Sequence, residues 1–144
     1  MPIVDGRYEA KISTTFETPE DGIDEIKKRI NKSRKIRING IPMGLLDELK
    51  PLLEKKDLKI ILPLGEKPSK DLKELCDVGT TKAKIYAEFG GQEVNTGSVA
   101  FPSLIYNIIW LGDEILQISA LEYSSCVKCM LESFEGGWRY SKKW

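Results

Sequence analysis

The sequence predicts a single-domain α/β protein whose mixed β-sheet carries helices on both faces. Two observations lead to this fold class. Strand-like and helix-like segments alternate over the first half of the chain, as in parallel crossover units, whereas the second half holds consecutive strand-like segments separated by glycine turns. The length of 144 residues is typical of one domain and is sufficient to bury a core without disulfides or metal ions.

The first half opens with a weak alternation over residues 7–15, which predicts a short strand, and continues with a clear helix start. Thr18 is a good N-cap, Pro19 fits the first helical position, and acidic residues follow in the first turn. The apolar residues that come next recur at helical spacing: Ile23, Ile26 and Ile30.

Residues 35–39 predict a short strand, and a second helix is expected over residues 45–53. Because Pro51 interrupts its backbone hydrogen bonds, we expect a kink or two abutting helices there. The compact apolar run 58–62 is typical of a buried parallel strand. A short helix then ends near residues 77–79.

In the second half, residues 82–89 alternate between apolar and polar side chains, and Gly90-Gly91 predicts a turn into a returning strand over residues 93–101. A short-hairpin signal at Gly112-Asp113 separates two further strands, and a helix follows them. Residues 136–144 are expected to form a basic and aromatic C-terminal tail.

The chain contains no histidine, although it has 22 basic and 22 acidic residues. Histidine is the usual proton shuttle near neutral pH and the commonest metal ligand. Its absence argues against triad catalysis, histidine-bearing zinc sites and phosphohistidine chemistry. No carboxylate pair stands out from the surface background, and no catalytic motif is complete, so the sequence favours a non-catalytic role without deciding whether the protein is an enzyme. We expect no cofactor.

The net charge is zero, so no global field favours nucleic acid or an anionic membrane. No stretch approaches the roughly 20 apolar residues of a membrane span, and the N-terminus lacks a leader pattern. Three cysteines do not make a secreted disulfide framework. We therefore expect a cytoplasmic protein without membrane contact.

Several segments carry a family resemblance over about residues 20–138: the helix before the first buried strand, Leu45 to Leu53 leading into Leu58 to Leu62 and Pro63, the strand Lys82 to Phe89, the pair Gly97-Ser98, the hairpin at Gly112-Asp113, and a last helix ending in Phe134 and Trp138. This order resembles one half of the phospholipase D-like superfamily, in particular the C-terminal effector domain of TrmB-type archaeal regulators. The resemblance implies a phospholipase D-like topology.

In the catalytic members of that superfamily, a histidine, a lysine and an aspartate precede a Gly-Ser pair, and the histidine is the nucleophile. Here Lys84 matches the lysine and Lys82 stands in the histidine's place, whereas Gly90-Gly91 stands where the aspartate is expected. The resemblance therefore implies the scaffold without the chemistry. It also implies a binding or regulatory role and a homodimer, because half-domains of this family commonly pair with a second copy.

The side chains of Lys82, Lys84 and Ser98 are the candidate binding site, since two ammonium groups and a hydroxyl suit a phosphate or carboxylate. The expected partner is a small anionic or sugar-like ligand. The alternative is a solvated strand face whose lysines discourage edge pairing.

Cys126 and Cys129 form the only spacing that suggests covalent chemistry. If the last helix begins at Ser124 or Ser125, Cys126 lies in its first turn, where a thiolate is stabilised. The alternative function is then a thiol redox switch or an oxidoreductase that uses Cys126 and Cys129. If instead the capping box Ser119–Glu122 starts the helix, Cys126 lies in the second turn. Structural cysteines, or a zinc site that includes Cys76, are the other interpretations.

The C-terminal tail interleaves basic and aromatic residues, as single-strand nucleic-acid platforms do. The residues are Trp138, Arg139, Tyr140, Lys142, Lys143 and Trp144. The tail is thus a candidate for nucleic-acid binding, with packing on the domain or on a partner subunit as the alternative.

Overall fold

The structure is a computed structural model that describes residues 13–122 and 124–144. The predicted strand over residues 7–15 is confirmed at its end, as β2 (Ser13–Thr15), and its first part lies outside the described residues. No helix in the described ranges is long and apolar enough to cross a membrane.

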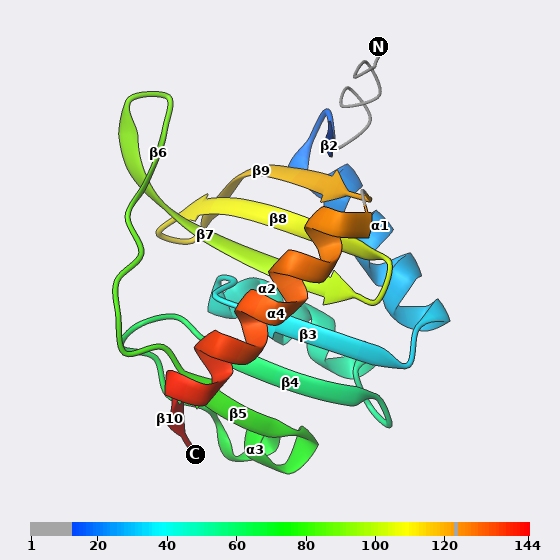
Figure 1. The fold of residues 1–144 in the computed structure, drawn as a ribbon, viewed down its shortest axis with the longest axis vertical. Coiled ribbons are helices and arrows are strands. Elements are labelled where there is room, and N and C mark those ends of the chain that lie inside the picture. Colours follow the sequence, from blue (N-terminus) through cyan, green and yellow to red (C-terminus); the bar gives the residue numbers. More distant parts are fainter. Residues whose placement is uncertain (1–12, 123) are drawn as a thin grey trace.

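One mixed sheet organises the fold (Figure 1). Its strands run in the order β10-β5-β4-β3-β7-β8-β9-β2, and β6 pairs with β7 outside this path. Besides β2, the strands are β3 (Lys35–Asn39), β4 (Asp57–Leu62), β5 (Asp77–Thr80), β6 (Ala87–Phe89), β7 (Gln92–Phe101), β8 (Leu104–Leu111), β9 (Glu114–Leu121) and β10 (Lys142–Lys143).

The direction of the strands changes along the chain as predicted. Strands β3, β4 and β5 are parallel to one another, and every other pairing is antiparallel. The parallel part is formed by strands that alternate with helices, and the antiparallel part by consecutive hairpins. Gly90, Gly91 and Gly112 all have positive φ at the hairpin turns, which is why glycine is found there.

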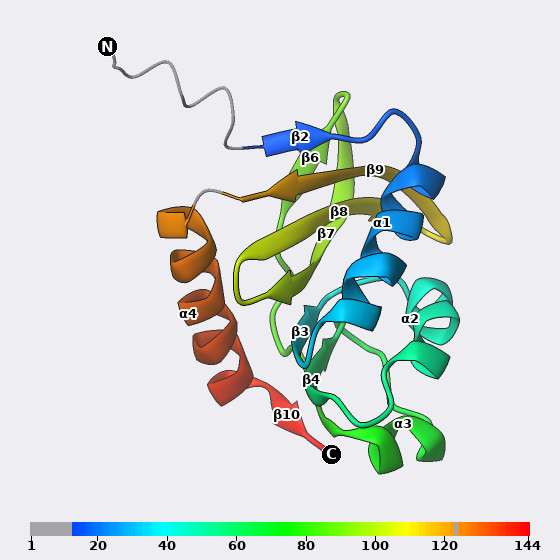
Figure 2. The same cartoon turned by 90° about the vertical axis from the view of Figure 1, so that its right-hand side faces the viewer.

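Helices cover both faces of the sheet, which confirms the predicted fold class (Figure 2). One face carries α1 (Pro19–Lys32), α2 (Met43–Leu49) with the 3₁₀ turn η2 (Lys50–Leu52), and α3 (Lys70–Leu75). The other face carries α4 (Ser124–Tyr140), with no second helix there in the described part of the chain. The larger core lies under α1 and α2, and a smaller cluster of Ala100, Ile105, Leu121 and Val127 lies toward α4.

Local signals account for the first helices. The Thr18 hydroxyl accepts a hydrogen bond from the Asp21 backbone N–H, and Pro19 occupies the first helical position. At the other end of α1, the Lys56 ammonium donates to the carbonyls of Ile30 and Ser33 at 2.9 and 2.6 Å. The expected break at Pro51 is the junction of α2 with η2.

Two predicted boundaries are wrong. Residues 77–79 belong to a strand, β5, because the parallel register with β4 supplies hydrogen bonds that the short segment does not signal by itself. The strand predicted over residues 82–89 is limited to β6, since residues 82–86 have no ladder partner in the described structure and are exposed. The alternation there does not mark a buried face: Ile85 is 66% exposed.

The last helix begins at Ser124, not at the capping box. Ser119 pairs with Asn107 of β8 and with Thr15 of β2, so the box residues 119–121 are the end of β9. Tertiary pairing on both sides outweighs the local capping signal. The helix also extends through Tyr140, so the first part of the predicted tail is helical.

Candidate functional site

A cavity of about 580 Å³ lies between α4 and the sheet. Strands β3, β4, β7, β8 and β9 contribute to its lining, and α4 adds Met130, Ser133 and Gly137 from the opposite side. The segment between β5 and β6 supplies Ala83, Lys84 and further residues to the wall. The volume is within the range of small-molecule sites, roughly 300–1,000 Å³.

Four polar side chains form a row across the sheet at this cavity. In the strand register Asn39 pairs with Ser98, Ser98 with Asn107, and Asn107 with Ser119. Cross-strand partners point to the same face, so these side chains lie next to one another. All four line the cavity and are half-buried. We call them the polar row.

The strands place the polar row by simple alternation. On β3, Ile36 and Ile38 are fully buried in the larger core, so Asn39 faces α4. On β8, Tyr106 and Ile108 occupy the same core, and Asn107 between them faces α4. Within the described residues the row makes no hydrogen bond to another protein side chain. Amides and hydroxyls both donate and accept, so the row offers neutral groups of both kinds to a ligand.

The structure brings two of the three predicted site residues to the cavity. Ser98 belongs to the polar row, and Lys84 lies at the cavity wall. The Lys84 ammonium is 3.5 Å from the Glu93 carboxylate and 5.0 Å from the centre of the Tyr86 ring. Lys82 is exposed and is not among the residues that line the cavity in the described part of the chain. The site is therefore less cationic than the sequence pattern indicates.

Gly97 has a structural reason to be glycine. A Cβ atom there would lie 2.6 Å from the Gly40 carbonyl carbon and 2.9 Å from the Asn39 carbonyl oxygen. Gly40 itself has φ +66°, and its carbonyl accepts a 2.9 Å hydrogen bond from Trp110 Nε1. This close approach of two backbones fixes the end of β3 against β7, and so positions Asn39 next to Ser98.

Comparisons with known proteins bear on this fold. No protein-family model matches the sequence, and no curated protein matches it. Among solved structures, the chain is similar to TrmBL2, an archaeal chromatin protein whose structure shows a novel mode of DNA binding, with a TM-score of 0.64 at 11% identity. The match covers 99% of this chain and 58% of TrmBL2, so the chain spans little more than half of that protein.

Two further structures match over nearly their whole length. They are Nuc from Salmonella typhimurium, a phospholipase D family member, and NucT from Helicobacter pylori. The match to Nuc has a TM-score of 0.56 at 12% identity and covers 92% of this chain and 97% of Nuc. The match to NucT has a TM-score of 0.61 at 7% identity and covers 92% of this chain and 98% of NucT.

The fold is phospholipase D-like. This confirms the fold that the sequence resemblance implies, and TrmBL2 shares that fold. In this phospholipase D-like fold, the segment that the resemblance aligns with the catalytic histidine and lysine is the irregular stretch 82–86 beside the cavity. The whole sequence contains no histidine, so the residue that acts as nucleophile in the superfamily is missing from it.

The two clustered cysteines lie in the first turns of α4. Cys126 is the third residue of the helix, as the redox hypothesis requires, and Cys129 is one turn further along. Both are free thiols; Cys126 is half-buried against the small apolar cluster and Cys129 is exposed. Among residues 13–122 and 124–144, no group of three or more acidic, cysteine or histidine side chains gathers to hold a metal ion.

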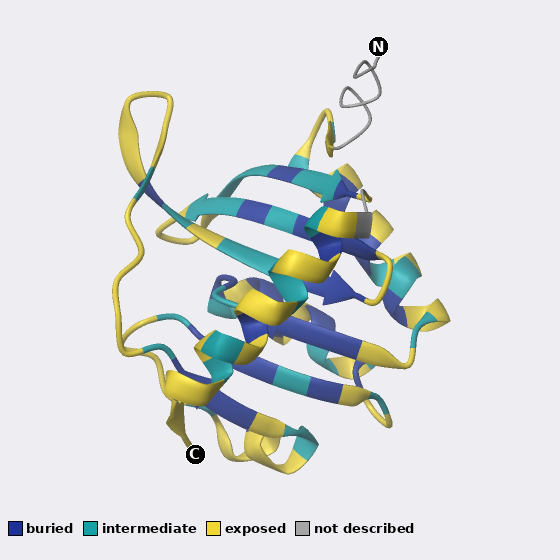
Figure 3. Cartoon of the chain, in the orientation of Figure 1, coloured by how far each residue is buried: buried dark blue, intermediate teal, exposed yellow. Residues whose placement is uncertain are grey.

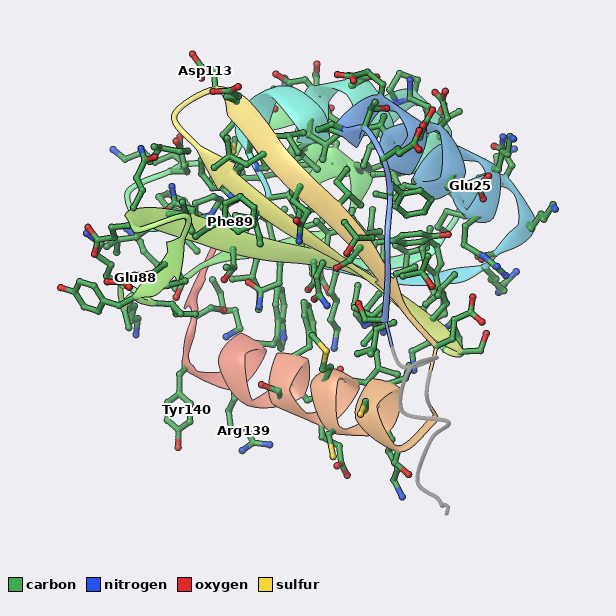
Figure 4. The ribbon with its side chains drawn as sticks, turned by 90° about the horizontal axis from the view of Figure 1, so that it is seen from above. Glu25, Glu88, Phe89, Asp113, Arg139 and Tyr140 are labelled. Atoms are coloured by element: carbon green, nitrogen blue, oxygen red, sulfur yellow. The ribbon has the colours of Figure 1, made fainter. Side chains whose placement is uncertain are left out.

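The C-terminal tail packs on the domain. Lys142 and Lys143 form β10 beside β5, the Trp144 backbone N–H donates to the Val78 carbonyl, and Trp144 Nε1 donates to Thr80 Oγ1 at 2.7 Å. Trp138 stacks on Phe134 with ring centres 6.4 Å apart. In Figure 4, Arg139 and Tyr140 point away from the sheet at the end of α4. Arg139, Tyr140, Lys142, Lys143 and Trp144 are all exposed, whereas Trp138 is half-buried.

Proposed function

We propose that this chain is a non-catalytic, single-domain binding module that holds a small polar ligand between α4 and the sheet and acts as a regulatory unit. The polar row is the observation that supports the proposal most directly. A buried or half-buried row of polar groups costs desolvation unless it finds hydrogen-bond partners, and a ligand supplies them. A cavity of about 580 Å³ gives that ligand room.

The chemistry of the cavity favours a hydroxyl-rich, sugar-like ligand over an anion. The polar row contains only neutral amides and hydroxyls, which match the mixed donor and acceptor pattern of sugar hydroxyls. Lys84 is the one cationic side chain among the described residues that line the cavity, and Glu93 already lies 3.5 Å from it. An anion would therefore meet a single, partly neutralised charge.

Isothermal titration calorimetry with a panel of mono- and disaccharides, together with inorganic phosphate and sulfate, tests this function. We expect at least one saccharide to bind the wild type, and Asn107→Leu to weaken it roughly tenfold or more, because hydrogen bonds lost at a polar site each contribute about 1 kcal/mol. Asn31→Leu, on the exposed face of α1, is the matched control and should bind normally. Equal affinity in both variants, or binding of phosphate and sulfate alone, would contradict the proposal.

The absence of catalysis has its own test. Without a histidine nucleophile, the purified protein should hydrolyse a generic phosphodiester such as bis(p-nitrophenyl) phosphate no faster than buffer. Hydrolysis that co-purifies with the protein would contradict this expectation. If Lys84→Met also abolished that hydrolysis, the module would be an enzyme.

We also propose that the module pairs with a second copy through the β6–β7 hairpin. This hairpin extends beyond the rest of the sheet, and its outer part is exposed (Figure 3). Phe89 of β6 and the preceding residues Ile85 and Tyr86 are 36%, 66% and 74% exposed. Exposed apolar groups of this size are typical of protein contact surfaces.

Light scattering should give a dimer for the wild type and a monomer for Ile85→Asp/Tyr86→Asp. A monomeric wild type would contradict pairing.

Nucleic-acid binding at the end of α4 is the second candidate. Tyr140 is 74% exposed beside the exposed Arg139, and Lys142 and Lys143 lie on the adjacent edge strand. TrmBL2 is described as a DNA-binding protein, which adds support. Retention on immobilised DNA should fall with rising salt and should be lost in Arg139→Ala/Tyr140→Ala. Unchanged retention in that variant would remove this surface as the binding site.

A further inference from the structure

A second cavity lies on the α4 face of the sheet and shares no lining residue with the first. Its volume is about 450 Å³, which also falls in the small-molecule range of roughly 300–1,000 Å³. It lies between the start of β3, the turn that joins β7 to β8, and one side of α4. Its lining residues are Lys35, Arg37, Pro102, Ser103, Glu122, Lys128, Leu131, Glu132 and Glu135.

Arg37 is the buried polar residue of this cavity. Arg37 is only 6% exposed. Both terminal nitrogens of its guanidinium group are hydrogen-bonded. Nη1 donates to the carbonyls of Ile36 and Asp57 at 3.0 and 2.8 Å, and Nη2 donates to the Asp57 carboxylate at 3.2 Å. Its Nε–H, in contrast, has no hydrogen-bond partner. A carboxylate oxygen of Glu135 on α4 forms an ion pair with Nε at 3.9 Å, which is beyond hydrogen-bond distance.

A buried guanidinium N–H without an acceptor is costly, and such groups are rare in folded proteins. The position next to Arg37 Nε therefore calls for an oxygen acceptor. Both Arg37 and Glu135 line the second cavity, and the Glu135 side chain is 50% exposed. A rotation of that side chain away from Arg37 lets an acceptor in the cavity approach Nε. A carboxylate is a strong, charge-assisted acceptor for a guanidinium N–H at neutral pH.

The charged side chains that line the second cavity restrict which class of ligand can bind there. The cavity has three cationic side chains, those of Lys35, Arg37 and Lys128, and three carboxylates, those of Glu122, Glu132 and Glu135. A simple anion would be attracted by the cationic side chains and repelled by the carboxylates. A simple cation would be attracted by the carboxylates and repelled by the cationic side chains. A molecule that carries both charges satisfies both sets. Pro102 and Leu131 add apolar surface for an aliphatic group.

We propose that the second cavity binds a small zwitterion of the α-amino acid class. Its carboxylate accepts a hydrogen bond from Arg37 Nε, its ammonium group lies near the glutamates of α4, and an aliphatic side chain contacts Leu131 and Pro102. The site is independent of the sugar-like ligand proposed for the first cavity, since the two sets of lining residues do not overlap.

Calorimetric titration of the full chain with L-leucine, acetate and methylamine tests the proposal. We expect L-leucine to bind at least tenfold more tightly than either singly charged probe. Lys128→Met and Glu132→Gln are exposed substitutions on α4 that leave the core intact, and each should weaken L-leucine several-fold. Arg37→Lys keeps the charge but lacks the Nε–H, and should abolish binding while circular dichroism reports a folded chain.

Asn107→Leu, in the first cavity, is the matched control and should leave L-leucine binding unchanged. Loss of binding in this variant, with no effect of Lys128→Met or Glu132→Gln, would place the amino acid in the first cavity and overturn the proposal. Acetate binding as tightly as L-leucine would overturn it in favour of an anion site. Absence of L-leucine binding at millimolar concentration would overturn it as well.

Discussion

Replacing Gly97 by alanine should destabilise the fold at the point that positions the polar row. The added Cβ would lie 2.6 Å from the Gly40 carbonyl carbon, and an ordinary contact is 3.4 Å or more, so the two backbones must separate by about 0.8 Å. Neither backbone is free to move. Asn39 is held in the ladder with β7, and the Gly40 N–H donates to the Ile61 carbonyl at 2.8 Å.

The expected magnitude follows from two contributions. Overpacking of a rigid contact costs roughly 1–3 kcal/mol, and this contact belongs at the upper end because both partners are backbone atoms. Displacing Gly40 also weakens the hydrogen bond that its carbonyl accepts from Trp110 Nε1, worth about 1 kcal/mol. We therefore expect Gly97→Ala to lower the free energy of unfolding by about 3 kcal/mol and Tm by roughly 10 °C.

Thermal and urea unfolding followed by circular dichroism measure this change. Gly136→Ala is the matched control, because a Cβ at Gly136 has no neighbour within 4 Å and the residue lies inside α4. Alanine there should stabilise the helix by up to about 1 kcal/mol. If Gly97→Ala melts within about 2 °C of the wild type, the close approach of β3 and β7 is not a constraint, and the reasoning fails.

Three further changes test other parts of the structure. Lys56→Met removes the ammonium that caps α1 and should cost about 1 kcal/mol in urea unfolding, whereas the exposed Lys70→Met should cost nothing measurable. Trp144→Phe keeps an aromatic ring but removes the N–H that donates to Thr80, and should lower the free energy of unfolding by about 1 kcal/mol. An unchanged urea midpoint would mean that this hydrogen bond does not stabilise the contact between the tail and β5. Burial, with a smaller effect of the neighbouring carboxylate, raises the pKa of Cys76 from 9.0 to about 12. The folded state thus favours the neutral thiol, so stability is fully present below pH 9 and declines as pH rises from 9 toward 12; Cys76→Ala should flatten the fall of the urea midpoint over this range.

Much of the fold could be predicted because its signals are local. The Thr18-Pro19 cap, the apolar run of β4 and the glycine turns at 90–91 and 112 each specify their own segment, and all are found where the sequence places them. The lack of catalytic histidine is likewise readable directly from the sequence.

The strands β5 and β10 could not be predicted, because their ladders depend on partners far away in the chain. Thr80 of β5 pairs with Leu62 on one side and with Lys142 on the other, and neither contact leaves a periodic pattern in four residues. The start of α4 also depends on distant partners, because Ser119 pairs with β2 and β8 and therefore belongs to β9 and does not cap the helix.

The candidate site was half visible in the sequence. The Gly-Ser pair indicates Ser98 and the lysine spacing before it indicates Lys84, but the sequence does not indicate Asn39, Asn107 or Ser119. Each of these three is a polar residue beside buried neighbours on a strand, which is a weak signal by itself. Only the cross-strand register, which joins residues up to 80 positions apart, assembles them into one row.

If the polar row binds a ligand, the side-chain amides of the row report that binding directly. In a ¹H–¹⁵N correlation spectrum, a saccharide that saturates the protein should shift the side-chain NH₂ pairs of Asn39 and Asn107, while that of Asn31 on α1 stays in place. Saturable shifts confined to Asn31 and other surface groups, with the Asn39 and Asn107 pairs unmoved, would contradict ligand binding by the polar row.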